Sequence, residues 1–239
     1  VVDRFRARSG ARPSVDKDDP DLHIHLHLYR DRATLALDTS GEALHKRGWR
    51  VHQGRAPLAE NLAAAVVQLS RWDRRAPLVD PFCGSGTLPI EAAWLAAGIA
   101  PGSMRTFGFE RWLDHDPAGF TRLRAARCGA KAVARRPTLL GFDLDAERVT
   151  EARANAEHAG VGAWIHFEVG DARLLELRAG WNASVVTNGP YGLRVGASDE
   201  LVPLYRAFGE RLRQRGQGCT LALLAGAHEH IRALGLHGL

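Results

Sequence analysis

Strand-like and helix-like segments alternate along the chain from residue 57 onward, and this order constrains the fold more than any other sequence feature. Such alternation predicts an α/β fold in which helices cover both faces of a mostly parallel, doubly wound sheet. Ligands of these sheets bind beyond the carboxyl ends of the strands. The predicted strands are 77–82, 138–143, 164–169, 183–187 and 219–224, and the predicted helices are 57–71, 88–97, 146–159, 200–213 and 227–234.

A different pattern precedes this region. Residues 21–29 alternate between aliphatic and histidine side chains, and residues 33–39 alternate again, which predicts a hairpin of half-buried strands. The basic segment 40–52 contains two glycines and is interpreted as a linker. Three histidines on one strand face could bind a metal, but we expect them to face solvent or RNA, so no metal site is predicted.

Composition limits the class of protein. The 239 residues are 45% hydrophobic, enough for one packed α/β domain and a small appendage. The sequence contains neither a long apolar run nor a signal-peptide core, so no membrane association is expected and the predicted location is cytoplasmic. The three cysteines, Cys83, Cys128 and Cys219, are widely spaced and form no C-x-x-C pair, which argues against a disulfide framework or a zinc site.

The net charge of +5 comes almost entirely from arginine, since the chain has only three lysines. Arginine suits phosphate binding and base stacking. A GC-rich genome would raise the arginine content equally well. The charge is therefore compatible with a nucleic-acid partner without establishing one.

The first candidate site is the loop from Asp80 to Thr87, D-P-F-C-G-S-G-T, between a predicted strand and a predicted helix. Glycines let a ligand approach the backbone closely, and the helix N-terminus offers unpaired N–H groups to an anion. Pro89 stands where a G-x-G-x-x-G loop has its third glycine, which disfavours a nicotinamide cofactor.

Two acidic candidates follow the next two strands. Asp143 is placed to accept both hydroxyls of a ribose, whereas Asp145 is interpreted as the N-cap of the helix that begins at Ala146. Asp171, followed by Ala172, could accept a hydrogen bond from an adenine amino group.

The last candidate is N-G-P-Y-G, from Asn188 to Gly192, after a buried strand. The exocyclic amine of a base is a poor nucleophile, because its lone pair is delocalised. An asparagine oxygen and a neighbouring carbonyl can accept its protons while an aromatic ring stacks on the extruded base. Taken alone, the motif also fits an ordinary Gly/Pro turn with an exposed tyrosine.

In this order and at these strand ends, the motifs resemble the THUMP-associated class I S-adenosylmethionine-dependent RNA methyltransferases, especially the bacterial 23S rRNA guanine-N2 methyltransferases. The similarity covers roughly residues 12 to 235. The matching runs are R-P-S-V-D-K-D-D-P-D, L-Y-R-D-R-A-T-L-A-L-D, S-G-E-A-L-H-K-R-G-W-R, A-P-L-A-E-N-L-A-A-A, D-P-F-C-G-S-G-T-L-P-I-E-A-A and V-T-N-G-P-Y-G-L-R.

The resemblance implies a division of the chain and a role for each motif. Residues 1–55 would be the tail of a THUMP-type RNA-binding region with its linker, and residues 56–239 a Rossmann-like methyltransferase domain that is truncated at its C-terminus. The amino-acid end of the cofactor S-adenosylmethionine would be held by the loop residues Asp80, Phe82, Cys83, Gly84, Gly86 and Thr87. The cofactor's ribose would be held by Asp143, and its adenine by Asp171 with Ala172. A flipped guanine of 23S rRNA would be held by Asn188, Gly189, Pro190 and Tyr191.

One position departs from the family pattern, which is Asn-Pro-Pro-Tyr. Gly189 replaces the first proline, so the carbonyl is kept but the fixed φ is lost. The added flexibility would cost about 0.5–1 kcal/mol of preorganisation. We therefore expect methyl transfer to be weakened rather than abolished.

Other functions remain open from the sequence. Guanine-N2 methylation of tRNA and N6 methylation of adenine use compatible chemistry, and a non-catalytic RNA-binding or assembly protein could retain the fold. Methylation at cytosine C5 is disfavoured, because no cysteine lies at residues 188–191 to act as the nucleophile. A nicotinamide dehydrogenase lacks both the third glycine and an obvious hydride-transfer residue.

Overall fold

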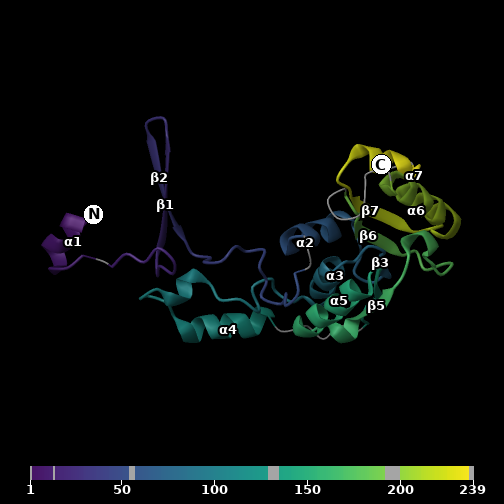
Figure 1. The fold of residues 1–239 in the computed structure, drawn as a ribbon. Helices are drawn as coiled ribbons and strands as arrows, with labels where there is room; N and C mark the ends of the chain where they lie inside the picture. Colours follow the sequence, from purple (N-terminus) through teal and green to yellow (C-terminus); the bar gives the residue numbers. More distant parts are fainter. Residues whose placement is uncertain (1, 13, 54–56, 129–134, 192–199, 237–239) are drawn as a thin grey trace. The chain divides into compact units, whose positions relative to one another are not determined.

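A five-stranded parallel sheet forms the centre of the larger part of the molecule (Figure 1). The computed structural model describes residues 2–12, 14–53, 57–128, 135–191 and 200–236. The strand order is β5-β4-β3-β6-β7, and every neighbouring pair is parallel. The strands are β3 (Leu78–Asp80), β4 (Leu139–Asp143), β5 (Ile165–Val169), β6 (Ser184–Asn188) and β7 (Thr220–Leu224).

This strand order places a topological switch between β3 and β6. The chain adds β4 and then β5 on one side of β3, and it returns to add β6 and β7 on the other side. In open α/β sheets, ligands bind outside the carboxyl ends of the strands at such a switch. The predicted doubly wound fold is confirmed, and it places the site at this edge of the sheet.

Both faces of the sheet are buried, because successive residues of a strand belong alternately to two different hydrophobic clusters. Leu78 and Val186 belong to one hydrophobic cluster, whereas Val79 and Val185 belong to the other. Helices α2, α3 and α5 contribute to the first cluster, and α6 and α7 lie against the opposite face (Figure 1). The helices are α2 (Glu60–Leu69), α3 (Thr87–Ala97), α5 (Ala146–His158), α6 (Leu201–Arg215) and α7 (His228–Leu234), with short 3₁₀ turns η2 (Gly162–Trp164) and η3 (Ala172–Leu174).

The N-terminal region contains the predicted hairpin, formed by β1 (His23–Tyr29) and β2 (Arg32–Asp38). The strands were expected to be half-buried, but both are exposed over almost their whole length. The alternation still separates two faces, because the register pairs His23 with Asp38 and Ile24 with Leu37. The aliphatic face is uncovered in the part of the chain that the structure describes, and Leu26 and Leu35 are 59% and 72% exposed.

Two helices and a 3₁₀ turn elsewhere in the chain were also not anticipated. They are α1 (Val2–Ser9), η1 (Gly108–Arg111) and α4 (Pro117–Cys128). Helix α2 also begins later than predicted, at Glu60 after an Ala59 cap, so Pro57 precedes the helix instead of opening it. None of the described helices has the length and apolarity needed to cross a membrane.

Contacts divide the chain into two compact units. One contains residues 1–43 and 106–121, and the other contains residues 44–105 and 122–239. The sequence-based boundary at 55/56 falls on residues 54–56, outside the described part of the chain. The segment interpreted as a linker differs from that expectation, because Trp49 is fully buried in the core of the second unit and Arg47 is 8% exposed.

Candidate functional site

Four of the predicted site residues form a row along the carboxyl edge of the parallel sheet. Asp171 follows β5, Asp143 ends β4, Asp80 ends β3 and Asn188 ends β6, and these strands are adjacent in that order. The sequence places each residue after its own strand, but only the sheet order makes them neighbours.

The glycine loop is tied to the neighbouring strand by backbone contacts. Gly84 donates its N–H to Asp143 Oδ2 at 2.9 Å, and the N–H of Cys83 donates to the carbonyl of Phe142 at 2.8 Å. Gly84 has φ +53°, and a Cβ added there would meet nothing within 4 Å. This backbone therefore borders open space, as the approach of a ligand requires.

Gly86 has a different structural role in the same loop. It caps α3 in the left-handed conformation with φ +85°, and a Cβ there would lie 3.0 Å from both Ala152 Cβ and Phe167 Cζ. A glycine is needed for both reasons, because the conformation disfavours side chains and the space is filled. The loop consequently delivers the N-terminus of α3 to the sheet edge, where its first N–H groups can bind an anion.

Asp80 is a buried carboxylate at the switch point. It is 1% exposed, and its Oδ1 accepts hydrogen bonds from Thr187 Oγ1 at 2.6 Å and from the N–H of Phe82 at 3.2 Å. Burial raises its pKa to about 7 despite these two bonds. Asp80 thus links β3, the glycine loop and β6, and it can change its ionisation near neutral pH.

Asp143 and Asp145 have different roles in the structure, and the role of Asp145 is the one that the sequence predicts. Asp145 is the N-cap of α5, and its Oδ1 accepts from the N–H of Glu147 at 2.8 Å, so the cap is confirmed. Asp143 accepts from the N–H groups of Gly84 and Asp145, one on each carboxylate oxygen. Partial burial raises its pKa.

Asp171 is engaged by a local partner. Its Oδ1 accepts from the N–H of Arg173 at 2.9 Å, and the Arg173 guanidinium contacts both of its carboxylate oxygens. These hydrogen bonds lower the pKa of Asp171. The Arg173 side chain is 52% exposed, so it can move aside if a ligand takes its place.

The remaining predicted residues support these positions. Phe82 packs edge-to-face on Phe208 with ring centroids 5.3 Å apart. Cys83 is buried, and burial raises the pKa of its thiol, which makes it an inert packing residue. Thr87 begins α3 and is 5% exposed, and Ala172 begins η3 and is 3% exposed.

The N-G-P-Y motif continues directly from β6. Asn188 Oδ1 is buried and has no hydrogen-bond partner among the described residues. Gly189 donates its N–H to the carbonyl of Leu224 at 3.0 Å, and Tyr205 Oη donates to the carbonyl of Pro190 at 3.0 Å. An unsatisfied buried acceptor is costly, so Asn188 is ready to accept a donor supplied from outside.

The space around Gly189, and not only its backbone flexibility, limits which residue can occupy position 189. A Cβ at this position would lie 2.1 Å from Tyr205 Oη and 2.9 Å from its Cζ. Tyr205 is fully buried, burial raises its pKa to about 12, and its ring stacks on His230 at 4.8 Å. The tyrosine hydroxyl therefore fills the volume in which the first proline of the family pattern would begin its side chain.

The sequence did not indicate a group of residues that holds the glycine loop in place by hydrogen bonds. Arg50 donates to Ser85 Oγ at 3.1 Å, to Thr87 Oγ1 at 3.0 Å and to Glu60 Oε1 at 2.7 Å. Asn155 of α5 is fully buried, and its amide donates to the carbonyl of Ser85 at 3.0 Å.

Asn155 also anchors the segment that carries Arg50. Its Oδ1 accepts from the N–H groups of Val51 and His52, both at 2.9 Å. Arg50 belongs to the basic run K-R-G-W-R, but the charge and the glycine of this run suggested a linker instead of a support for the loop. Thr187 lies within a predicted strand, and no local pattern indicates that its hydroxyl donates to Asp80.

A parallel sheet of this order, with a glycine loop after its first strand and acidic residues at or just after the ends of the next two, is the arrangement of a Rossmann-like class I methyltransferase domain. Comparison with known proteins specifies the family. The family model described as "RMKL-like, methyltransferase domain" matches residues 47–237, and the THUMP domain matches residues 1–38. The chain belongs to the RMKL-like methyltransferase family.

Curated relatives agree with this assignment. Proteins named ribosomal RNA large subunit methyltransferase K/L are 44% identical in Pseudomonas entomophila and 42% identical in Psychromonas ingrahamii, each over 99% of this chain. The chain spans about a third of these relatives, 34% and 32% of their lengths.

Solved structures are similar over almost the whole chain. A protein described as a possible methylase from Clostridium difficile 630 has a TM-score of 0.86 and 32% identity, covering 98% of this chain and 61% of its own. SMU.472, described as "a putative methyltransferase complexed with SAH", has a TM-score of 0.85 and 31% identity with the same coverage.

Proposed function

We propose that this protein transfers a methyl group from S-adenosylmethionine to the exocyclic N2 amine of a guanine in 23S rRNA. The observation that carries the proposal is the unpartnered Asn188 oxygen at the end of β6, the strand next to β3, which ends at Asp80 and leads into the glycine loop. The names of the curated relatives support a ribosomal RNA substrate.

Cofactor binding is assigned to the edge formed by β3, β4 and β5. The open backbone at Gly84 and the N-terminus of α3 suit the carboxylate of the amino-acid end. Asp143 is placed to accept from ribose hydroxyls, since its two oxygens keep lone pairs beyond those used by Gly84 and Asp145. Asp171 would accept from the adenine amine after Arg173 moves. The SAH-bound relative SMU.472 supports this cofactor class.

The target base is assigned to the motif after β6. Asn188 Oδ1 and the carbonyl of Gly189 would accept the two amine protons of an extruded guanine, and Tyr191 would stack on the base. Tyr205 keeps this backbone in place through its hydrogen bond to the carbonyl of Pro190. Holding the amine in this orientation favours attack by its nitrogen lone pair.

The sulfonium of the cofactor supplies an electrophilic methyl group, so the protein needs neither a covalent nucleophile nor a metal for this transfer. As the new N–C bond forms, the C–S bond breaks, SAH is the second product, and the amine proton leaves to water. The chain's own contribution is alignment, which can supply about 7–11 kcal/mol when reactants are held in line. The THUMP match at residues 1–38 favours an RNA partner, and the site of action would be the cytoplasm.

The decisive experiment is nucleoside mass spectrometry on unmodified 23S rRNA and on tRNA, each incubated with the protein and S-adenosylmethionine. We expect N2-methylguanosine in the rRNA alone. Product in tRNA, or product appearing as N6-methyladenosine, would refute the assigned substrate while preserving the chemistry. Cofactor binding without product in either RNA would favour a non-catalytic RNA-binding role.

A matched pair of variants tests the role of Asn188. Asn188→Ala removes the acceptor for the amine protons and should lower kcat by about 10²–10³, the usual loss for one preorganised polar group. Asn61→Ala changes an exposed asparagine of α2 and should leave kcat unchanged. Equal rates for Asn188→Ala and the unmodified protein would remove Asn188 from the mechanism.

A further inference from the structure

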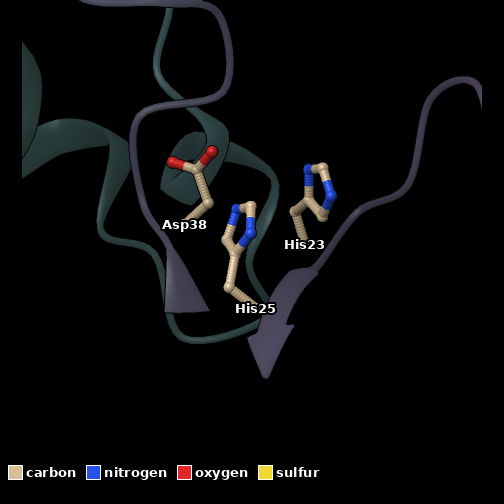
Figure 2. A group of neighbouring side chains, drawn as sticks. All are labelled: His23, His25 and Asp38. Atoms are coloured by element: carbon tan, nitrogen blue, oxygen red, sulfur yellow. The ribbon is translucent and has the colours of Figure 1, made fainter. Parts of the chain in front are cut away.

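The polar face of the hairpin brings two histidines and an aspartate together. His23 and His25 lie two residues apart on β1, so they share a face, and His23 is the cross-strand partner of Asp38 on β2. Nitrogen and oxygen ligand atoms from the three side chains all lie within 4.8 Å of one another. Figure 2 shows the His25 ring between the Asp38 carboxylate and the His23 ring.

The two rings are free to bind a ligand. They stack with centroids 4.6 Å apart and an interplanar angle of 22°. Neither ring has a hydrogen-bond partner among the described residues, whereas the His158 ring bonds to the carbonyl of Trp49 at 2.8 Å. Both histidines are exposed, so their side chains can rotate without disturbing a core.

The aspartate is held more firmly than the histidines. Its Oδ1 accepts from the N–H groups of Ser40 and Gly41, which leaves Oδ2 for another partner. The turn is backed by the segment around η1, because Phe109 donates to the carbonyl of Thr39 and Gly108 lies against Gly41.

We propose that His23, His25 and Asp38 form a binding site for a zinc-class divalent metal ion, with water completing the coordination. Two imidazoles and one carboxylate are ligands that zinc favours. Around a tetrahedral zinc with bonds of about 2.0–2.2 Å, ligand atoms lie about 3.3–3.6 Å apart. Ligand atoms at the 4.8 Å limit must therefore approach one another by about 1.2–1.5 Å. The ion would link the start of β1 to the end of β2.

His27 offers a matched control within the same pattern. It lies on the same face and is also exposed, but its cross-strand partner is Thr34 instead of an acid, and it is outside the cluster. The sequence alone favoured solvent-facing or RNA-facing histidines and did not distinguish the three. The pairing register of β1 and β2 distinguishes them, because it places Asp38 opposite His23, at one end of β1.

Isothermal titration of the chelator-treated 239-residue chain with Zn²⁺ tests the site. We expect one saturable site, weakened at least about tenfold in His23→Ala, His25→Ala and Asp38→Asn, since even second-shell losses cost that much. His27→Ala and Asp31→Asn, the latter at the exposed hairpin turn, should bind as tightly as the unmodified chain.

Titration with Co²⁺ gives a second readout, because its absorption spectrum reports the ligands. A spectrum of nitrogen and oxygen ligation that is lost in Asp38→Asn is expected. Binding that survives Asp38→Asn would show adsorption to the histidines alone and would overturn the site. A thiolate charge-transfer band would assign the metal to a cysteine, and no saturable binding would also refute the proposal.

Discussion

At the residue scale, the site depends on polar groups whose partners are fixed by neighbouring strands. Asp80 and Thr187 are 107 positions apart in sequence but share a 2.6 Å hydrogen bond. Gly189 and Tyr205 compete for one volume, since a Cβ at position 189 would lie 2.1 Å from the tyrosine hydroxyl. The first contact affects the ionisation of Asp80, and the second affects the shape of the N-G-P-Y motif.

Gly189 and Tyr205 should therefore be energetically coupled. Gly189→Ala should destabilise the fold by about 1–3 kcal/mol through overpacking, and Tyr205→Phe by about 0.5–1.5 kcal/mol through loss of its hydrogen bond. In the double variant the hydroxyl is absent and the clash is partly relieved, so the combined loss should be smaller than the sum. Urea unfolding of all four proteins measures this difference.

Strict additivity would contradict the coupling. The tyrosine also limits a return to the proline of the family pattern, because the side chain of Gly189→Pro would meet Tyr205. The substitution would also remove the N–H that Gly189 donates to the carbonyl of Leu224. We therefore expect Gly189→Pro by itself to lower methyl transfer, although proline would fix the backbone.

Asp80 should make stability depend on pH near neutrality. Its pKa rises from 3.8 to about 7 on folding, so the folded chain holds the proton more tightly. The resulting stability is fully present below about pH 4 and is lost as pH rises through 7. Between pH 5 and pH 8 this loss amounts to about 2–3 kcal/mol.

Asp80→Asn keeps an acceptor for Thr187 and removes the titration. The variant should lose less stability than the unmodified chain when urea unfolding is compared at pH 5 and pH 8 without cofactor. An identical pH dependence would show that Asp80 does not carry the effect. Glu91, whose pKa burial also raises to about 7, would then be the next candidate.

At the element scale, the segment before α2 is part of the support of the glycine loop between β3 and α3. Arg50 contacts two side chains of the loop, Ser85 and Thr87, and Asn155 fixes the backbone on either side of this contact. The segment 47–52 therefore acts as a brace for the loop, and the family match, which begins at residue 47, includes this segment.

Arg50→Lys tests this brace. Lysine keeps the charge but cannot present several donors in a fixed fork to Glu60, Ser85 and Thr87. We expect the Kd for SAH to rise about tenfold, which corresponds to about 1.4 kcal/mol. Arg148→Lys, which changes an arginine paired with Glu151 on α5, should leave the Kd unchanged. Equal affinity for Arg50→Lys and the unmodified chain would exclude the brace.

At the scale of the whole molecule, the chain consists of two compact units with separate internal contacts. A ligand that binds only the sheet unit stabilises that unit by mass action. At 100 times its Kd, SAH should contribute about 2.7 kcal/mol.

Hydrogen exchange followed by mass spectrometry resolves this effect by region. We expect slower exchange of β3, β4 and β6 in the presence of SAH, with peptides from β1 and β2 unchanged. Equal protection of both regions would mean that the two units open together.

The sequence by itself determined the order of elements, the class of fold and the strand ends at which polar residues cluster. These features depend on local periodicity, turn residues and motif spacing, all of which are carried by neighbouring positions in the chain. The Asp145 cap and the helix stop at Gly98, which has φ +68°, are of this kind. The family motifs of the glycine loop and of N-G-P-Y are likewise local in sequence.

Only the tertiary structure decided which of these residues meet. Strand order brought Asp80 to Thr187, packing of α6 placed Tyr205 against Gly189, and hairpin register gave Asp38 to His23 rather than to His27. The same is true of Arg50, whose basic surroundings suggested a linker. Contacts between distant segments depend on how elements pack, and no local pattern in a single sequence encodes that arrangement.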